Sequence, residues 1–330
     1  MAELRLRKDP LQLLAREYRE MNGTHVEVLP EPPSALEFSR LVHISRPVLI
    51  QRLELPAHRL WSDQYLIKKL SSQHLSVAVT PDGRADAIHT GPDGLDYFVE
   101  PLVEKLTIQE LLNQISNGEN GVYYLQSQNG NMFSSGDDDD GLHISEFDCL
   151  RSDIVSEIDW CTDALGRQRE AVNIWIGNGK SVTSFHSDPY ENIYSVVRGE
   201  KRFTLIPPTD GWSLQERFYP HARFTRSSPD GPLEITPSSE DTPLVRWSSL
   251  PDRNLLESLP ANVRPIQVTV RPGQAMYLPV GWWHHVEQSD ETTIALNWWY
   301  DAESQGLQWA VLRALREAEH VPKANEKDSA

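Results

Sequence analysis

Two histidines and one aspartate occupy positions that suit a transition-metal site. His186 and Asp188 lie two residues apart, at the head of a stretch that predicts a β-strand. Because side chains alternate along a strand, residues two apart share one face and reach the same ion. A later histidine pair, His284 and His285, supplies the third ligand. Two histidines and a carboxylate form the facial triad of non-haem Fe(II), which leaves open positions for a bidentate cosubstrate and for dioxygen.

The spacing by itself is a weak signal, because the same His-x-acid pattern recurs at His25 and at His285. Strand alternation distinguishes the two histidines of the late pair. His284 shares its face with Val286, whereas His285 shares its face with the polar Glu287. The pattern therefore predicts that His284 is the inward ligand.

A lysine is expected on the inner face of the same barrel. Lys201 has the parity of Phe203 and Leu205, the apolar face of the strand after a Gly turn. An inward lysine costs free energy unless an anion neutralises it, so we expect Lys201 to bind a carboxylate of a dicarboxylic cosubstrate. The alternative is that Lys201 lies at the strand end and reaches water. The hydroxyl groups of Thr183 and Tyr124 are candidates for the same carboxylate.

Short β-branched and aromatic runs dominate the chain from residue 171 onward. They are separated by Gly and Pro turns without intervening helices, which predicts an all-β sandwich or barrel. A Pro- and Ser-rich insertion at 207–262 interrupts the series, and it is either a functional, lid-like loop or a tolerated excursion. The runs are AVNIWIG, ENIYSVV, KRFTLIP, IQVTV, QAMYLPV, HHVEQ and TTIALNWWY.

Helical patterns flank this series on both sides. Apolar spacing and capping residues predict helices at 1–20, 35–42, 63–72 and 107–117, and strands at 46–51, 75–83 and 121–128. An amphipathic helix is expected at 304–320, and its apolar face must pack on the barrel or on a second copy of the chain.

Composition narrows the class of protein. The chain has 330 residues, of which 39% are hydrophobic and 24% charged, a balance typical of globular proteins. It contains neither an apolar run of ~18 residues nor a secretory signal pattern. Its two cysteines, Cys149 and Cys161, exclude a disulfide scaffold and a cysteine-based zinc site. We expect a cytoplasmic location, with the nucleus as the alternative.

The net charge of −17 disfavours nucleic acid and anionic membranes as partners. A basic or lysine-bearing protein segment is the better partner, unless the charge serves solubility alone. The acidic run at 137–140 is interpreted as a solvated loop, because it lacks the spacing of a calcium loop.

Together these residues resemble the JmjC family of Fe(II)- and 2-oxoglutarate-dependent oxygenases. The segments 182–208, 272–288 and 293–301 carry the family's His-x-Asp, lysine and distal histidine in order. Small JmjC hydroxylases, such as the asparaginyl hydroxylase of hypoxia-inducible factor, are more similar than large histone demethylases. Within that group, 75–88 and 121–126 resemble the (3S)-lysyl hydroxylases. The resemblance runs from about 35 to 315 and is weakest in 129–150 and 209–262.

The resemblance implies a mainly β fold, a double-stranded β-helix (jelly roll or cupin) with flanking N-terminal helices and a C-terminal helix that forms a homodimer. We expect an extension at 1–120, the JmjC core at 121–301 with its insertion at 207–262, and a C-terminal helix and tail at 302–330. The implied Fe(II) ligands are His186, Asp188 and His284. The implied 2-oxoglutarate residues are Tyr124, Thr183 and Lys201 at the far carboxylate, Asn192 and Asn297 near the keto-acid end, and Trp299 beside the site.

The family further implies a protein hydroxylase that consumes O₂ and releases succinate and CO₂. A lysyl residue of a protein such as a developmentally regulated GTP-binding protein is the implied target. Alternatives are a JmjC demethylase or peptidase acting on histone tails, a non-catalytic metal-binding cupin, and a cupin isomerase with zinc or manganese. No nucleophile motif supports the peptidase.

Overall fold

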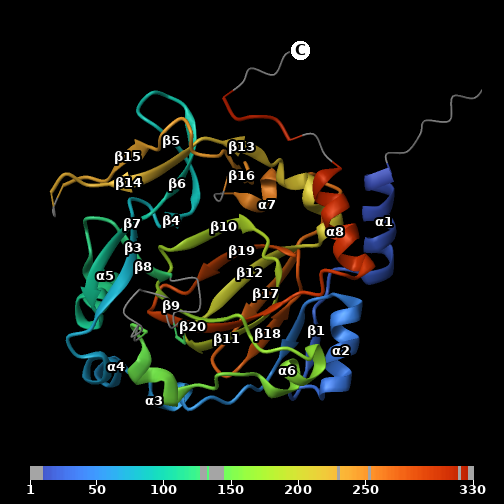
Figure 1. Ribbon diagram of the computed structural model, residues 1–330, viewed down its shortest axis with the longest axis horizontal. Coiled ribbons are helices and arrows are strands. Elements are labelled where there is room, and N and C mark those ends of the chain that lie inside the picture. The colour runs from blue at the N-terminus through green and yellow to red at the C-terminus, as the bar shows by residue number, and fades with distance from the viewer. Residues whose placement is uncertain are drawn as a thin grey trace, which may run out of the picture.

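Two β-sheets face each other and enclose the space between them (Figure 1). The computed structural model describes residues 10–126, 132–133, 145–228, 231–251, 254–318 and 321–325, so the acidic run at 137–140 lies outside the described residues. The architecture is mainly β with helices at its surface, which confirms the predicted double-stranded β-helix.

The larger sheet forms one wall of the barrel. Its strands lie in the order β1-β2-β18-β11-β20-β9-β8-β3-β7. Most of its central strands were predicted as short β-branched and aromatic runs, since such residues suit a strand that is buried on both faces. Their bounds are β1 Glu27–Leu29, β2 Val48–Ile50, β3 His74–Thr80, β7 Leu102–Thr107, β8 Val122–Gln126, β9 Ala171–Gly177, β11 Tyr190–Arg198, β18 Ala275–Leu278 and β20 Thr293–Asp301.

The smaller sheet forms the opposite wall. Its order is β17-β12-β19-β10-β4, and β19 pairs antiparallel with both β10 and β12. This places the early His-x-Asp segment beside the late histidine pair, although about a hundred residues separate them in the sequence. The bounds are β4 Arg84–Ala85, β10 Val182–His186, β12 Lys201–Ile206, β17 Ile266–Val270 and β19 Trp283–Gln288.

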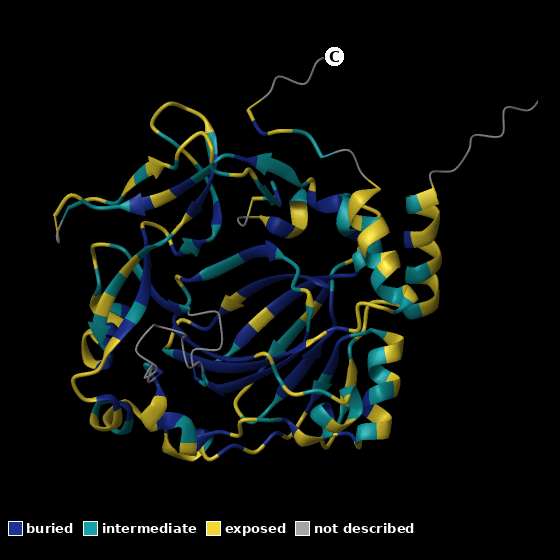
Figure 2. Ribbon diagram, viewed as in Figure 1, coloured by how far each residue is buried: buried dark blue, intermediate teal, exposed yellow. Residues whose placement is uncertain are grey.

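Separate apolar clusters occupy the two faces of the larger sheet. Between the sheets, Tyr194, Phe203 and Met276 belong to a cluster that fills the closed end of the barrel. On the outer face, Phe38 and Trp298 belong to a cluster shared with the covering helices. Figure 2 shows the central strands as buried and the helices as exposed on one side.

The helices begin where the sequence provides caps. Ser34 forms a capping box with Glu37, and Thr107 forms one with Glu110, which satisfies backbone N–H groups at the start of each helix. The helices and 3₁₀ segments are α1 Pro10–Asn22, α2 Ala35–Ile44, α3 Ala57–Leu60, α4 Asp63–Leu70, α5 Ile108–Asn117, η1 Asp148–Asp153, α6 Asp159–Leu165, η2 Pro208–Leu214, α7 Leu255–Ser258 and α8 Leu307–Glu317. No helix in the described part of the chain is long and apolar enough to cross a bilayer.

The insertion at 207–262 contains regular structure above the barrel opening (Figure 1). Strand β14 (His221–Thr225) pairs with β15 (Glu234–Pro237) and with β6 (Asp96–Glu100), which in turn pairs with β5 (Ala87–Thr90). Strand β13 (Arg217–Tyr219) pairs with β16 (Val245–Trp247). The insertion is thus joined to the N-terminal extension through a shared four-stranded sheet.

The C-terminal helix α8 packs with only part of its apolar face on this chain. Leu312 and Leu315 line a pocket with Trp283, whereas Leu307 and Val311 stay exposed. The homodimer predicted through this helix stays a prediction.

Candidate active site

The structure brings the three predicted metal ligands together at the barrel opening. His186 ends β10 and lies opposite His284 of β19 in the strand register. Asp188 lies in the connection between β10 and β11, so the chain turn rather than strand alternation brings it to His186. Its carboxylate oxygens are 3.8 Å from His186 Nε2 and 3.6 Å from His284 Nε2. The three ligand atoms lie within 4.8 Å of one another.

Backbone hydrogen bonds orient both imidazole rings. Nδ1 of His186 lies 2.9 Å from the Ser184 carbonyl oxygen, and Nδ1 of His284 lies 3.0 Å from the Trp282 carbonyl oxygen. Donation from Nδ1 leaves the lone pair on each Nε2, the atom that faces Asp188. Burial, together with the neighbouring His186, holds the pKa of His284 well below its usual range. Two imidazoles and one carboxylate are a donor set that fits a divalent transition metal.

His285 lies on the opposite face of β19. It is buried against Phe185, with ring centroids 5.7 Å apart, and does not belong to the triad. The alternation of side chains therefore places His284, as expected, on the inner face.

Lys201 is fully buried beside Tyr124, which lines the same cavity as the three metal-ligand candidates. Its Nζ donates to the Tyr124 hydroxyl at 3.0 Å and lies 5.0 Å from the centre of that ring. Among the described residues this hydroxyl is its only hydrogen-bonding partner. Burial lowers the pKa of Lys201 to about 7. A buried ammonium without a carboxylate is costly, so the position fits an anion that comes from outside the chain.

Gly177 provides the space in which Tyr124 approaches Lys201. A Cβ atom at Gly177 would lie 2.6 Å from Tyr124 Cδ2 and 2.7 Å from Gln288 Nε2. Burial raises the pKa of the Tyr124 hydroxyl, and a side-chain hydrogen bond with Thr183 opposes that shift. The three residues predicted for the far carboxylate are therefore adjacent.

Two buried asparagines lie between the triad and the floor of the larger sheet. Asn297 Nδ2 donates to Asn192 Oδ1 at 3.2 Å, and Asn297 Oδ1 accepts from Trp175 Nε1 at 2.8 Å. Trp299 borders the same cavity and stacks on Tyr190, with centroids 5.0 Å apart. The cavity is lined by Tyr124, Trp175, Thr183, His186, Asp188, Asn192, Tyr194, Phe203, His284, Val286, Asn297 and Trp299.

Comparison with known proteins agrees with this geometry. The cupin-like domain family matches residues 33–306. The lysine-specific demethylase JMJ32 of Arabidopsis thaliana is 38% identical over 89% of this chain and 87% of its own length. The human bifunctional peptidase and (3S)-lysyl hydroxylase JMJD7 is 35% identical over 84% of each chain. JmjC domain-containing protein E of Dictyostelium discoideum is 34% identical over 87% of each. The chain belongs to the JmjC family of cupin-like proteins.

As a JmjC protein, the chain is a 2-oxoglutarate-dependent dioxygenase. JmjC oxygenases use Fe(II) and 2-oxoglutarate. The His-Asp-His cluster lines the same cavity as Tyr124, to which the buried Lys201 donates, and these residues fit the two groups. Imidazole and carboxylate groups are suitable ligands for a metal ion, and an ammonium group is a suitable partner for the carboxylate of a dicarboxylic acid.

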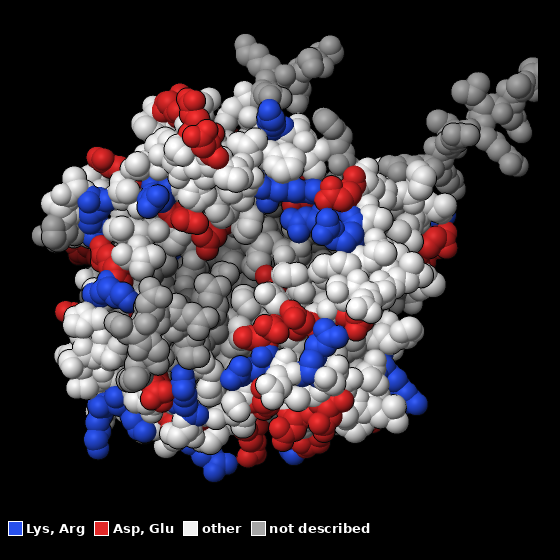
Figure 3. Space-filling model, in the orientation of Figure 1, with Lys and Arg blue, Asp and Glu red and all other residues white. Residues whose placement is uncertain are grey.

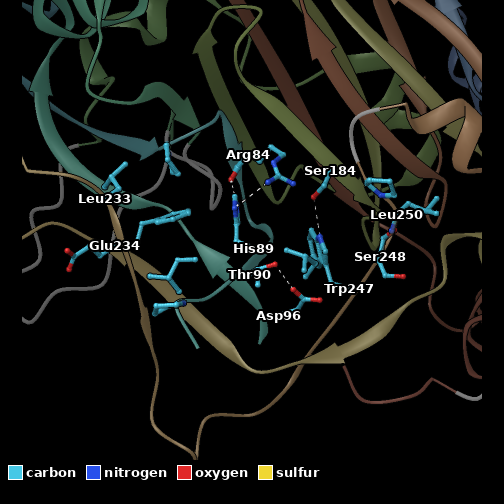
Figure 4. A pocket seen from close by; sticks show the side chains of 17 residues that line it. Arg84, His89, Thr90, Asp96, Ser184, Leu233, Glu234, Trp247, Ser248 and Leu250 are labelled. Atoms are coloured by element: carbon cyan, nitrogen blue, oxygen red, sulfur yellow. Dashed lines mark hydrogen bonds between the residues drawn. The ribbon is translucent and has the colours of Figure 1, made fainter. Parts of the chain in front are cut away.

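One aromatic contact of the JmjC site was missed at the level of sequence. Trp247 of β16 stacks on the predicted metal ligand His186, with centroids 6.2 Å apart and planes 6° apart. Its Nε1 donates to Ser184 Oγ at 3.1 Å (Figure 4). Trp247 lies in the Pro- and Ser-rich insertion, where no periodic pattern marked a strand. The contact shows that the insertion covers one side of the metal centre.

A cleft of about 770 Å³ extends from this tryptophan over the smaller sheet. It lies between β4 to β6 on one side and β14 to β16 on the other, and Figure 4 shows its lining residues. A second pocket opens toward α8 and includes Asp188 and Arg246. The metal centre of this JmjC protein is therefore reached between the insertion and the elements around it.

Proposed function

We propose that this chain is an Fe(II)- and 2-oxoglutarate-dependent protein hydroxylase that oxidises a lysyl side chain. The observation that carries the proposal is the pairing of two donor groups in one cavity. The triad of His186, Asp188 and His284 lies at the open end, and Lys201 with Tyr124 lies at the buried end. This arrangement suits a cosubstrate with a metal-chelating end and a distant carboxylate.

Each group of residues has a separate task in this proposal. When bound, Fe(II) and 2-oxoglutarate supply the oxidation, in which O₂ is consumed, succinate and CO₂ are released and a C–H bond gains a hydroxyl group. His186, Asp188 and His284 hold the metal. Lys201 and the hydroxyls of Tyr124 and Thr183 hold the far carboxylate by charge and hydrogen bonding. The buried amides of Asn192 and Asn297 lie near the keto-acid end, and Trp299 packs beside it, so water is excluded from the reacting groups.

The relatives favour a protein substrate. The human relative is named for (3S)-lysyl hydroxylation, and its match extends over 84% of this chain. A lysine of a developmentally regulated GTP-binding protein is the substrate we propose. The formal charge of −17 is compatible with such a lysine-bearing partner.

Demethylation is the second candidate, because the relative at 38% identity is named a lysine-specific demethylase. The two reactions share the same oxidation and differ in the carbon that is oxidised. Hydroxylation at a methyl carbon of a methylated amine releases formaldehyde, whereas hydroxylation of a lysyl carbon leaves a stable product heavier by one oxygen atom.

The first test needs no substrate. Metal-free protein is titrated anaerobically with Fe(II) and 2-oxoglutarate while the visible charge-transfer band is recorded. We expect a band that disappears in Asp188→Ala and weakens in Lys201→Met. Folded wild-type protein that binds metal without the band would refute the cosubstrate site and favour a non-catalytic cupin.

The second test identifies the reaction. A purified developmentally regulated GTP-binding protein is incubated with enzyme, Fe(II), 2-oxoglutarate and air, and its peptides are analysed by mass spectrometry. Hydroxylated lysine with equimolar succinate supports the proposal. Formaldehyde from a trimethyl-lysine peptide, without hydroxylated lysine, would favour demethylation. Asp188→Ala is the control, and product formed by that variant would refute the assignment of the metal site.

A further inference from the structure

One carboxylate at the opening of the active site has no assigned role. Asp86 follows directly after β4, which pairs parallel with β10 so that Ala85 lies opposite Thr183. The Asp86 carbonyl oxygen accepts a hydrogen bond from Ser184 Oγ at 3.2 Å. Asp86 therefore lies beside the end of β10, where the metal ligand His186 is located.

The side chain of Asp86 contacts a residue on the cavity face of the larger sheet. Its Oδ2 accepts a hydrogen bond of 3.0 Å from Gln126 Nε2. Gln126 is opposite Trp175 in the β8–β9 register, and Trp175 lines the metal cavity. Because paired residues of antiparallel strands project from the same face, Gln126 and the carboxylate it binds lie on the cavity side of the sheet. Asp86 has a left-handed backbone (φ 53°), which departs from the alternation of an extended strand at this point.

This carboxylate has no lysine or arginine partner among the described residues. Gln126 is its one hydrogen-bond donor there, and the nearby Arg84 forms an ion pair with Asp82 at 2.8 Å. Burial and the nearby Glu100 raise the pKa of Asp86 to about 6. A largely buried carboxylate that lacks a lysine or arginine partner and has a left-handed backbone is costly to a stable fold. An unfavourable free energy of this kind near an active-site opening is typical of a group that binds a ligand.

We infer that Asp86 receives the ammonium group of the substrate lysine while the metal centre oxidises a carbon of the same side chain. This inference rests on the proposed lysyl hydroxylation and names the residue that selects the substrate. Overall charge does not make that selection, since acidic and basic side chains are interspersed on the face shown in Figure 3. A single hydrogen-bonded carboxylate near the oxidised carbon can select a cation by position.

The occupancy of the two carboxylate oxygens indicates which cation fits. Oδ2 already accepts from Gln126, which leaves Oδ1 of Asp86 for the ligand. An ammonium group is a compact donor that needs one such oxygen, whereas an arginine guanidinium is bound best by both oxygens together. A trimethylated lysine has no N–H to donate. We therefore expect the site to bind unmodified lysine more tightly than arginine or trimethyl-lysine.

The test compares binding under anaerobic conditions, so that no oxidation is required. Enzyme loaded with Fe(II) and 2-oxoglutarate is offered peptide mixtures with random flanks and a central lysine, norleucine, arginine or trimethyl-lysine. Norleucine keeps the aliphatic chain through Cε and carries a hydrogen atom in place of the ammonium group. A charge-assisted hydrogen bond in a partly buried site predicts that lysine is retained over norleucine by a factor on the order of ten. Asp86→Asn should reduce that ratio to near one.

Two controls make the result specific. Asparagine tolerates a left-handed backbone and can still accept from Gln126, so Asp86→Asn should keep its charge-transfer band. Glu100→Gln removes the same charge from a nearby, more exposed position and should keep the preference for lysine. An equal loss of preference in both variants, or a preference that survives in Asp86→Asn, would overturn the inference.

Hydroxylation is measured separately, so the two proposals fail differently. Lysine preference that depends on Asp86, without any oxidised lysine, would count against the proposed reaction alone. Oxidised lysine from an enzyme that binds lysine and norleucine equally would refute the role of Asp86 alone.

Discussion

The buried ammonium of Lys201 predicts that binding of 2-oxoglutarate depends on pH. Burial lowers the pKa of Lys201 to about 7, so the side chain in the free enzyme is mostly charged at pH 6 and mostly neutral at pH 8. A bound carboxylate favours the charged form, so the complex holds a proton that the free enzyme has lost. The charged fraction is about 0.9 at pH 6 and about 0.1 at pH 8, which predicts a Kd about tenfold higher at pH 8.

The assay is calorimetric titration of metal-loaded enzyme with 2-oxoglutarate at pH 6, 7 and 8, in the absence of O₂. Titrations in two buffers with different ionisation enthalpies report the uptake of close to one proton at pH 8. Lys201→Met removes the charge and keeps much of the aliphatic volume, so its weak binding should be independent of pH. A constant Kd in wild-type enzyme, or the same pH dependence in Lys201→Met, would refute the reasoning.

The same substitution is expected to stabilise the protein without ligand. The unfolded chain holds Lys201 at its ordinary pKa of 10.5, so at pH 7 folding forces a charged group into a site that favours the neutral form. Because a lowered pKa in a base means that the folded state binds fewer protons, this cost declines as the pH rises from 7 to 10.5. The difference corresponds to at most about 5 kcal/mol, so Lys201→Met should raise the melting temperature of the free enzyme at pH 7 while weakening cosubstrate binding.

Three further predictions follow from the described contacts. His284→Ala should abolish Fe(II) binding in an equilibrium metal titration, whereas His285→Gln, on the other face of β19, should keep it despite some loss of stability. Gly177→Ala should displace Tyr124 and raise the Kd for 2-oxoglutarate several-fold, with Fe(II) affinity unchanged; equal losses of both would contradict this. Burial raises the pKa of Glu191 to about 7, so the folded state binds the extra proton and stability falls as pH rises from 4.5 to 7. Glu191→Gln should therefore raise the melting temperature at pH 8 by the equivalent of up to about 3 kcal/mol and change it little at pH 5, and an equal effect at both would refute this.

Strand alternation explains why much of the site was predictable. The inner positions of His284 and Lys201 follow from local parity, since a one-residue shift would exchange the two faces of a strand. The short runs from residue 171 onward are strands, with bounds close to those expected, because β-branched and aromatic residues between Gly and Pro turns favour extended backbone. The capped helix that begins after Thr107 was likewise fixed by neighbouring residues. These features depend on interactions within a few residues of each other.

The features that sequence analysis missed depend on distant segments or on irregular backbone. Asp188 was expected on a strand but lies in a connection, where alternation gives no direction. Trp247 reaches His186 only because β16 folds over β10, and nothing in its own segment records that contact. Asp86 has a positive φ, which removes it from the pattern of the strand it follows. Prediction of these positions needs the tertiary structure.

Residues on regular strands and residues in irregular segments have different functions in the proposed active site. In the proposed function, regular strands supply the inner positions for metal and cosubstrate, whereas irregular segments supply the side from which a substrate would enter. Ser184 connects the two, because its carbonyl oxygen orients His186 while its hydroxyl accepts from Trp247 and donates to the Asp86 backbone. The carbonyl bond fixes the metal ligand independently of the hydroxyl, so the entrance can differ between JmjC proteins without altering the metal centre. Substrate preference in this chain is therefore expected to depend on the segments around Asp86 and Trp247, and the oxidation itself on the barrel.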